Sequence, residues 1–216
     1  MNTCKLSIRL FSYTSLVLLL SFLAVHPAYA DEDPYFGLKL GYTHFLSTNV
    51  NDSENRSVKF KQNDTTALGG VIGMSYKAIP FLGLRTDLEY MYRFPTNTKI
   101  GTSPNITGKL TSHTALANMY IDFYVLPFIS VYVGGGIGLS VVELTLKNNV
   151  TSGSKTSPYF AAQAGGGLQF ILLKHLVFDL NVRYLYLGDW KRSFSGNSFN
   201  STLSGVETTV GIAYRF

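Results

Sequence analysis

The sequence predicts an all-β fold: an eight-stranded antiparallel up-and-down transmembrane β-barrel. The first observation is the segment from 206 to 216, where apolar or aromatic residues at even positions alternate with small, polar or charged residues at odd positions. Successive side chains of a strand point to opposite faces, so this segment has one oily face and one wet face. The second is that similar alternation recurs in eight segments. The third is that the connections alternate between long and short, which is typical of barrels in an outer membrane.

Residues 1–30 are predicted to be a cleaved secretory signal peptide, and residues 31–216 the outer-membrane β-barrel. Lys5 and Arg9 precede a mostly apolar run over 10–25, and the small residues of the segment 28–30 predict cleavage after Ala30. A membrane-anchoring helix is the alternative, but the apolar run is short for a span of ~20 residues. The chain's single cysteine, Cys4, lies before the apolar run, so the mature chain is expected to lack a thiol.

The composition favours strands over helices. Charged residues make up 14% of the chain, whereas about 25% is usual for a soluble domain. The sequence also holds 14 Tyr, 15 Phe and 20 Gly. No apolar stretch of ~18 residues follows the leader, so no transmembrane helix is expected. The formal net charge of +5 falls to +3 when Lys5 and Arg9 are removed, which is too weak to indicate nucleic-acid binding.

The first four strands are expected at 35–46, 65–77, 82–93 and 112–125. The third is the clearest, because leucines and tyrosines alternate with Arg85, Asp87, Glu89 and Arg93. Two polar segments, 47–64 and 94–111, are expected as long loops. A short turn is expected at 77–81, where Pro80 interrupts the alternation.

The last four strands are expected at 130–146, 158–171, 176–187 and from 206 to the end. In the first two, glycines share the polar face, opposite aliphatic and aromatic residues. In the third, Asp179, Asn181 and Arg183 alternate with apolar positions. The long loops are expected at 147–157 and 188–203, and the short turns near Pro127 and at 173–175.

The wet face predicts which side is inside. A lipocalin also has eight strands, but its apolar face turns inward. Here the wet faces carry five basic and five acidic side chains, which fits a polar interior because a buried charge is costly unless it is paired. The predicted lumen ion-pair network comprises Lys39, Arg85, Asp87, Glu89, Arg93, Asp122, Asp179, Arg183, Glu207 and Arg215. Eight strands leave an interior that side chains can fill, so a plugged lumen is expected, with a narrow channel for small solutes as the alternative.

Four segments, 116–123, 131–138, 160–167 and 178–185, resemble opacity-type, OmpA-like outer-membrane barrels, a group also called the porin family or surface antigens. The resemblance covers essentially the whole mature chain. It implies a bacterial outer-membrane location with variable loops at the cell surface. It also implies delivery by periplasmic chaperones and a C-terminal aromatic signal read by the barrel-assembly machinery, which Tyr214 and Phe216 match.

The sequence contains no motif typical of catalysis or of cofactor or metal binding, so no catalytic, cofactor or metal residue is predicted. His44, His113 and His175 are not spaced as metal ligands, and no cysteine supports them. Outer-membrane lipid A deacylases are eight-stranded and use a His, a Ser and an acid. Ser112, His113 and Glu143 lack the His-x-Ser order of that family, so a lipid A-modifying enzyme is the weaker alternative.

The predicted loops contain more basic than acidic residues. A basic rim would be attracted to lipopolysaccharide phosphate or to a host receptor or sulfated glycan, and salt would screen that attraction. The leading interpretation is therefore a non-enzymatic surface barrel, structural and a candidate for adhesion or immune evasion through four loops. The loop-binding candidates are Arg56, Lys59, Lys61, Lys99, Lys109, Lys147, Lys155, Trp190, Lys191 and Arg192.

Overall fold

The computed structural model describes residues 31–46, 48–51, 57–100, 107–147, 152–172, 175–194 and 197–216. The predicted leader, residues 1–30, lies outside them. Residues Glu32–Phe216 form one compact unit. Within the described ranges, no helix has the length and apolar character needed to cross a membrane.

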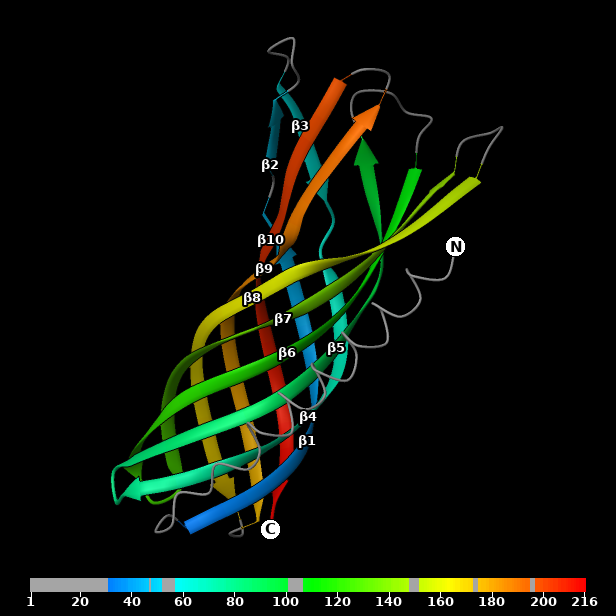
Figure 1. The fold of residues 1–216 in the computed structure, drawn as a ribbon. Helices are drawn as coiled ribbons and strands as arrows, with labels where there is room; N and C mark the ends of the chain where they lie inside the picture. The colour runs from blue at the N-terminus through cyan, green and yellow to red at the C-terminus, as the bar shows by residue number, and fades with distance from the viewer. Residues whose placement is uncertain are drawn as a thin grey trace, which may run out of the picture. The chain divides into compact units, whose positions relative to one another are not determined.

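Eight long strands close into an antiparallel barrel (Figure 1). Around the wall they follow the order β5-β4-β1-β10-β9-β8-β7-β6, and β6 pairs back with β5. The predicted fold class is therefore confirmed. The long strands are β1 (Asp31–Phe45), β4 (Thr65–Ile79), β5 (Leu82–Ile100), β6 (Thr107–Leu126), β7 (Ile129–Lys147), β8 (Ser152–Leu172), β9 (Leu176–Phe194) and β10 (Asn197–Arg215), and two short strands, β2 (Thr48–Asn51) and β3 (Ser57–Gln62), lie between β1 and β4.

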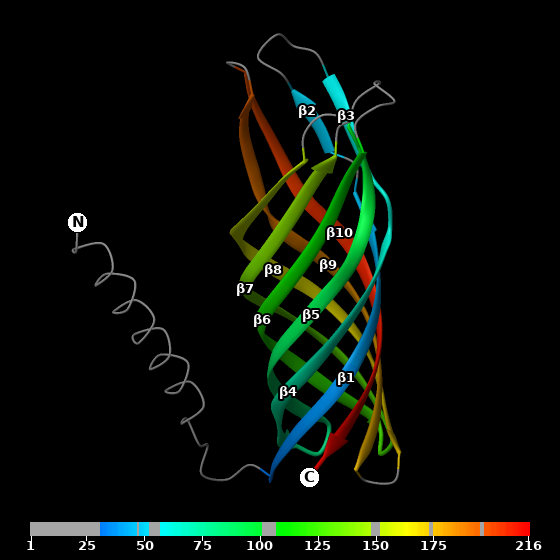
Figure 2. The same cartoon turned by 90° about the vertical axis from the view of Figure 1, so that its right-hand side faces the viewer.

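Short turns gather at one end of the barrel, which we call the turn end. The start of β1 and the C-terminus lie at this end (Figure 2). Backbone hydrogen bonds tie its rim together: the Tyr124 amide donates to the Phe81 carbonyl at 3.0 Å, and the Phe216 amide donates to the Pro34 carbonyl at 3.0 Å. The opposite end carries the connections from β1 to β4, β5 to β6, β7 to β8 and β9 to β10, and we call it the loop end.

The two faces of the wall are those that the alternation predicts. On β9, Leu180 is 44% exposed on the outer face, whereas Arg183 is 1% exposed on the inner face. The large exposed apolar side chains, such as Ile137 and Val210, recur around the outer wall. Such a surface is suited to contact with lipid hydrocarbon. In water it would be an exposed apolar patch far larger than those of soluble monomers.

The long loops were predicted too long. The predicted loop 94–111 is strand up to Ile100 and again from Thr107, and the segment 188–203 is strand except for 195–196, which lie outside the described residues. Beyond the membrane both faces of a strand meet water, so hydropathy no longer alternates although the hydrogen-bonded ladder continues. The pattern therefore marks the length of the apolar band, not the length of the strand.

The wall separates along one line near the loop end. Paired positions in β8 and β9 reach Ala162 and Tyr186 and end there within the described residues, while β8 continues along β7 to Ser152 and β9 along β10. Gly188, just beyond this point, has a φ of 112°. The upper parts of β8 and β9 diverge in Figure 1.

Candidate functional site

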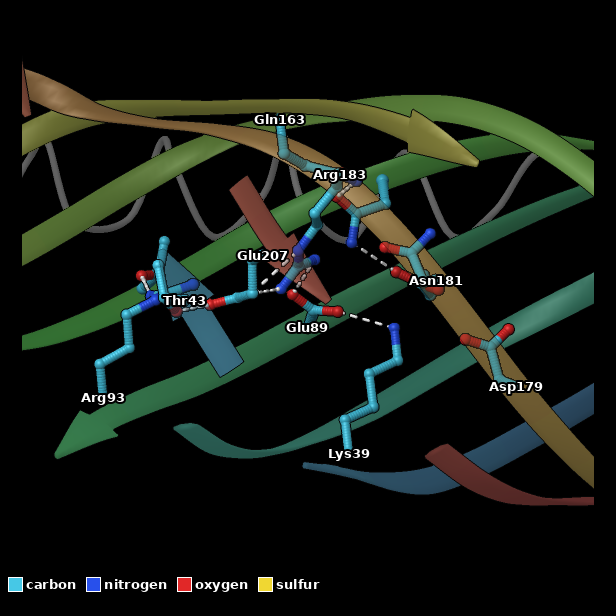
Figure 3. A network of polar contacts seen from close by, with 12 residues as sticks. Lys39, Thr43, Glu89, Arg93, Gln163, Asp179, Asn181, Arg183 and Glu207 are labelled. Carbon is cyan, nitrogen blue, oxygen red and sulfur yellow. Dashed lines mark hydrogen bonds and ion pairs between the residues drawn. The ribbon is translucent and has the colours of Figure 1, made fainter. Parts of the chain in front are cut away.

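The lumen holds all ten charged side chains that the alternation placed on the wet face. Each is buried, and they come from β1, β5, β6, β9 and β10. Figure 3 shows several of them pointing toward one another across the interior. The structure divides them into two groups, one nearer each end.

The outer cluster consists of Lys39, Glu89, Arg93, Arg183 and Glu207. Lys39 Nζ donates to Glu89 at 2.7 Å, and Arg183 Nη1 donates to the other oxygen of Glu89 at 2.6 Å. Arg183 also contacts Glu207 through Nε at 3.0 Å and Nη2 at 2.5 Å. Arg93 Nε donates to Glu207 at 2.8 Å. The result is a continuous chain of alternating charges that crosses the lumen (Figure 3).

The register between neighbouring strands explains part of this line of alternating charges. Glu207 on β10 lies directly opposite Arg183 on β9 and Thr43 on β1, and facing side chains in paired strands come within contact distance. Thr43 adds a hydrogen bond to Glu207 at 2.5 Å. Arg93 also contacts the hydroxyl of Thr114 on β6. Glu89 reaches Arg183 across the lumen, and closure of the barrel brings them together.

The inner cluster, nearer the turn end, consists of Arg85, Asp87, Asp122, Asp179 and Arg215. Arg85 Nη2 donates to Asp122 at 3.3 Å, and its Nη1 lies 3.9 Å from Asp179. Asp87 is satisfied by neutral groups: Tyr35 donates at 2.7 Å and Asn118 at 2.7 Å. Arg215 lies at the rim, 4.0 Å from Asp33.

Buried tyrosines complete the inner cluster. The Arg85 guanidinium lies 4.6 Å from the Tyr120 ring centroid and 4.4 Å from that of Tyr132, a cation–π arrangement. Tyr132 also donates to Asp179 at 2.9 Å. The sequence reasoning missed this role, although the register carries a signal: Tyr120 faces Gly134 on β7, and Tyr132 faces Gly167 on β8. A glycine opposite each ring leaves the space that the ring fills.

The loop end of the lumen contains an apolar layer that the sequence reasoning also missed. Phe45, Leu116, Ala161, Leu185 and Leu187 form one buried cluster. Leu185 and Leu187 share the inner face of β9 with Arg183, so the wet face is not polar throughout. At the turn end, a cavity of about 20 Å³ is lined by residues that include Tyr35, Lys39, Arg85 and Arg215, which is room for about one water molecule.

The residues of the weaker enzymatic alternative do not converge. Ser112 is buried on the inner face of β6, whereas His113 faces outward and is hydrogen-bonded to Tyr90. Adjacent strand residues point to opposite faces, so Ser112 and His113 cannot form a nucleophile–base pair. Among the described residues, no group of three or more His, Cys, Asp or Glu is placed to hold a metal ion.

The structure places the proposed assembly signal on the outer wall at the turn end. The Phe216 ring lies 5.2 Å from that of Tyr214 and 5.9 Å from that of Phe36 on β1. Tyr214 and Phe216 are exposed. Their recognition by the assembly machinery stays a prediction.

The loop candidates lie mostly outside what the structure describes. Arg56 falls in an undescribed range, and Lys109 is described, with an exposed side chain on β6. For the others the backbone belongs to strands, but the side chains lie outside the described part. These are Lys59, Lys61, Lys99, Lys147, Lys155, Trp190, Lys191 and Arg192.

Comparison with known proteins agrees with this architecture. The family model described as the outer membrane protein beta-barrel domain matches residues 15–216. Outer membrane protein PagN of Salmonella typhimurium is 27% identical over 177 residues, which cover 68% of this chain and 72% of PagN. OprG from Pseudomonas aeruginosa superposes with a TM-score of 0.57 at 15% identity, covering 87% of this chain and 97% of OprG. AlkL, whose structure was solved in DMPC lipid bilayers, superposes with a TM-score of 0.52 at 15% identity, covering 89% of this chain and 94% of AlkL.

Proposed function

The chain belongs to the outer membrane protein beta-barrel domain family, and from this premise we propose that it acts as a closed, non-enzymatic scaffold that holds four loops at the cell surface. The protein is located in the bacterial outer membrane. The apolar outer wall faces lipid, and the loop end faces the outside of the cell. We also propose that residues 1–30 are a signal peptide and that it is cleaved after Ala30.

The filled lumen is the observation that supports a scaffold over a channel. Five charged side chains of the outer cluster cross the interior, and an apolar layer lies above them. The interior of an eight-stranded barrel is just wide enough for its side chains to fill. An ion would have to displace paired charges, which are costly to separate in a buried setting.

Single-channel recording of the refolded protein in planar bilayers tests this proposal. We expect the parent to show no defined conductance steps. The triple substitution of Lys39, Glu89 and Arg183 by alanine should create steps, because it empties the centre of the lumen while the Arg93–Glu207 pair is kept. The Lys77→Ala variant, altered at an exposed position near the turn end, is the control. Defined steps from the parent would favour the narrow-channel alternative.

The basic loops support a second part of the proposal, that the loop end binds sulfated glycans or a host receptor. We expect vesicles carrying the protein to bind immobilised heparin at low salt and to lose binding as salt screens the charges. Replacing Lys59, Lys61, Lys191 and Arg192 by glutamine should weaken binding at least tenfold, whereas Lys77→Gln should not. Equal binding by both variants would contradict this role for the loops.

A further inference from the structure

One sector of the outer wall changes from apolar to polar at a defined height. On β6, the outward positions between His113 and Phe123 are Ala115, Ala117, Met119 and Ile121, all apolar. His113 stands ten positions from Phe123, which at ~3.3 Å per residue and a tilt of ~40° is about 25 Å along the barrel axis. That is roughly the height of the apolar band of such barrels. His113 therefore lies where the hydrocarbon of the extracellular leaflet ends.

Aromatic groups hold the His113 ring in place. Its Nδ1 is 2.6 Å from the Tyr90 hydroxyl, and its ring centroid is 4.9 Å from that of Tyr92, its register partner on β5. Tyr92 in turn packs edge-on against Phe94 at 5.1 Å. Because Nδ1 is engaged by Tyr90, Nε2 is the ring atom available to a ligand.

Two charged side chains share this outer face. Lys109 is exposed on β6, four positions nearer the loop end than His113, and its long stem can carry the ammonium group toward the membrane surface. Glu143 on β7 is exposed and lies opposite Thr111, between the two basic residues. The sector thus offers an imidazole Nε2–H, oriented by the Tyr90 hydroxyl, and an ammonium group as hydrogen-bond donors, with the Glu143 carboxylate beside them limiting the positive charge.

His44 is exposed, whereas His113 is half-buried, and the two have different environments. His44 Nδ1 lies 2.8 Å from Asp64, whose second oxygen accepts a hydrogen bond from Tyr42 at 2.8 Å. A carboxylate beside His44 repels an anion. His113 is hydrogen-bonded to the neutral phenol of Tyr90 instead, so the two histidines form a matched pair for experiment.

We propose that Lys109 and His113, whose ring Tyr90 orients, form a binding site on the outer wall for a phosphate group of the lipid A headgroup in the extracellular leaflet. The imidazole Nε2–H and the ammonium group donate hydrogen bonds that suit a phosphate, and bonds to a charged group are the stronger kind. This inference needs the outer-membrane location alone. It does not depend on the loop binding or on the closed lumen proposed above.

The test measures lipid retained by the folded full-length mature chain. The protein is refolded in phosphatidylcholine vesicles that contain either diphosphoryl lipid A or the same lipid A without phosphates, then extracted in mild detergent for native mass spectrometry. We expect the parent to retain diphosphoryl lipid A at least tenfold more than the dephosphorylated form. The double variant His113→Gln with Lys109→Gln should retain about tenfold less diphosphoryl lipid A than the parent. This is the scale expected for one lost hydrogen bond to a charged group.

Three controls make the outcome specific. His44→Gln should leave retention unchanged, because Asp64 already occupies that imidazole. Glu143→Gln should increase retention, since it removes a carboxylate beside the two basic residues. Inorganic phosphate at millimolar concentration should not replace the lipid, because the acyl chains also contribute to binding. Equal retention of both lipids, an unchanged double variant, or an equal loss in His44→Gln would each overturn the site, and a gel shift on boiling shows that every variant has folded.

Discussion

Glu207 joins three other strands through one carboxylate, because it accepts hydrogen bonds from Thr43, Arg93 and Arg183. Its side chain is fully buried. A buried ion pair that loses one partner leaves the other charge uncompensated. Glu207→Gln keeps the shape of the side chain but leaves two arginines facing a neutral amide.

We therefore expect Glu207→Gln to lower the free energy of unfolding by about 3–5 kcal/mol, measured by urea unfolding of the protein in phosphatidylcholine vesicles. Glu32→Gln, at a half-buried position near the start of β1, is the matched control and should change little. An unfolding midpoint for Glu207→Gln equal to that of the parent would show that the outer cluster does not stabilise the barrel.

The sequence was sufficient to select the charged lumen residues but not to pair them. Alternation marks Arg183 as a wet-face residue, yet its partner Glu89 lies 94 positions away in the chain, and only closure of the barrel brings them together. The packing of the buried tyrosines against Arg85 was missed for a different reason. Tyrosine occurs on both faces here: Tyr132 is buried in the lumen, while Tyr184 is exposed on the outer wall.

At the scale of the element, the glycines of β7 create room for the inner cluster. A methyl group added at Gly134 would lie 2.2 Å from the Met119 backbone oxygen and 2.5 Å from Tyr120 Cδ1, and the Tyr120 ring is one of the two beside Arg85. Gly70 on β4 offers a matched comparison, because a methyl group there would meet its nearest atom at 3.5 Å, an ordinary contact.

Gly134→Ala is thus expected to destabilise the barrel by about 1–3 kcal/mol, the usual cost of overpacking, whereas Gly70→Ala should be near neutral. Urea unfolding in vesicles gives both values. Equal effects of the two substitutions would mean that the loss of glycine from a strand, and not the crowding against Met119 and Tyr120, determines the cost.

Strand ends were the least predictable elements. The alternation that located β5 disappears after Arg93, and yet the strand continues to Ile100, where it pairs with β3. The register also shifts between Arg93 and Thr96, so the two faces exchange positions along the chain. A shift of one residue reverses the faces, which hides the pattern even where a ladder persists.

At the scale of the whole molecule, the fold class and its inside-out orientation followed from the sequence because lipid imposes both. Hydrocarbon cannot hydrogen-bond to backbone groups, so strands in a bilayer must close on themselves. A polar face then has only the lumen to occupy. The apolar layer of Phe45, Leu116 and Leu185 could not be predicted this way, because a filled interior tolerates apolar and polar side chains alike.

Closure depends on the ladder between β1 and β10, and it gives the final prediction. Val210 lies outward on β10, opposite Leu40 on β1 and Leu180 on β9. A proline at 210 removes a backbone donor from a strand that has a neighbour on each side, and the unsatisfied carbonyl would face hydrocarbon at a cost of several kcal/mol. Val210→Pro should therefore lose the band that the folded, unboiled parent gives on a detergent gel, while Val210→Ala, at the same exposed position, should keep it. If the proline variant kept the parent's shift on boiling, closure at this seam would not be what makes the barrel resistant to detergent.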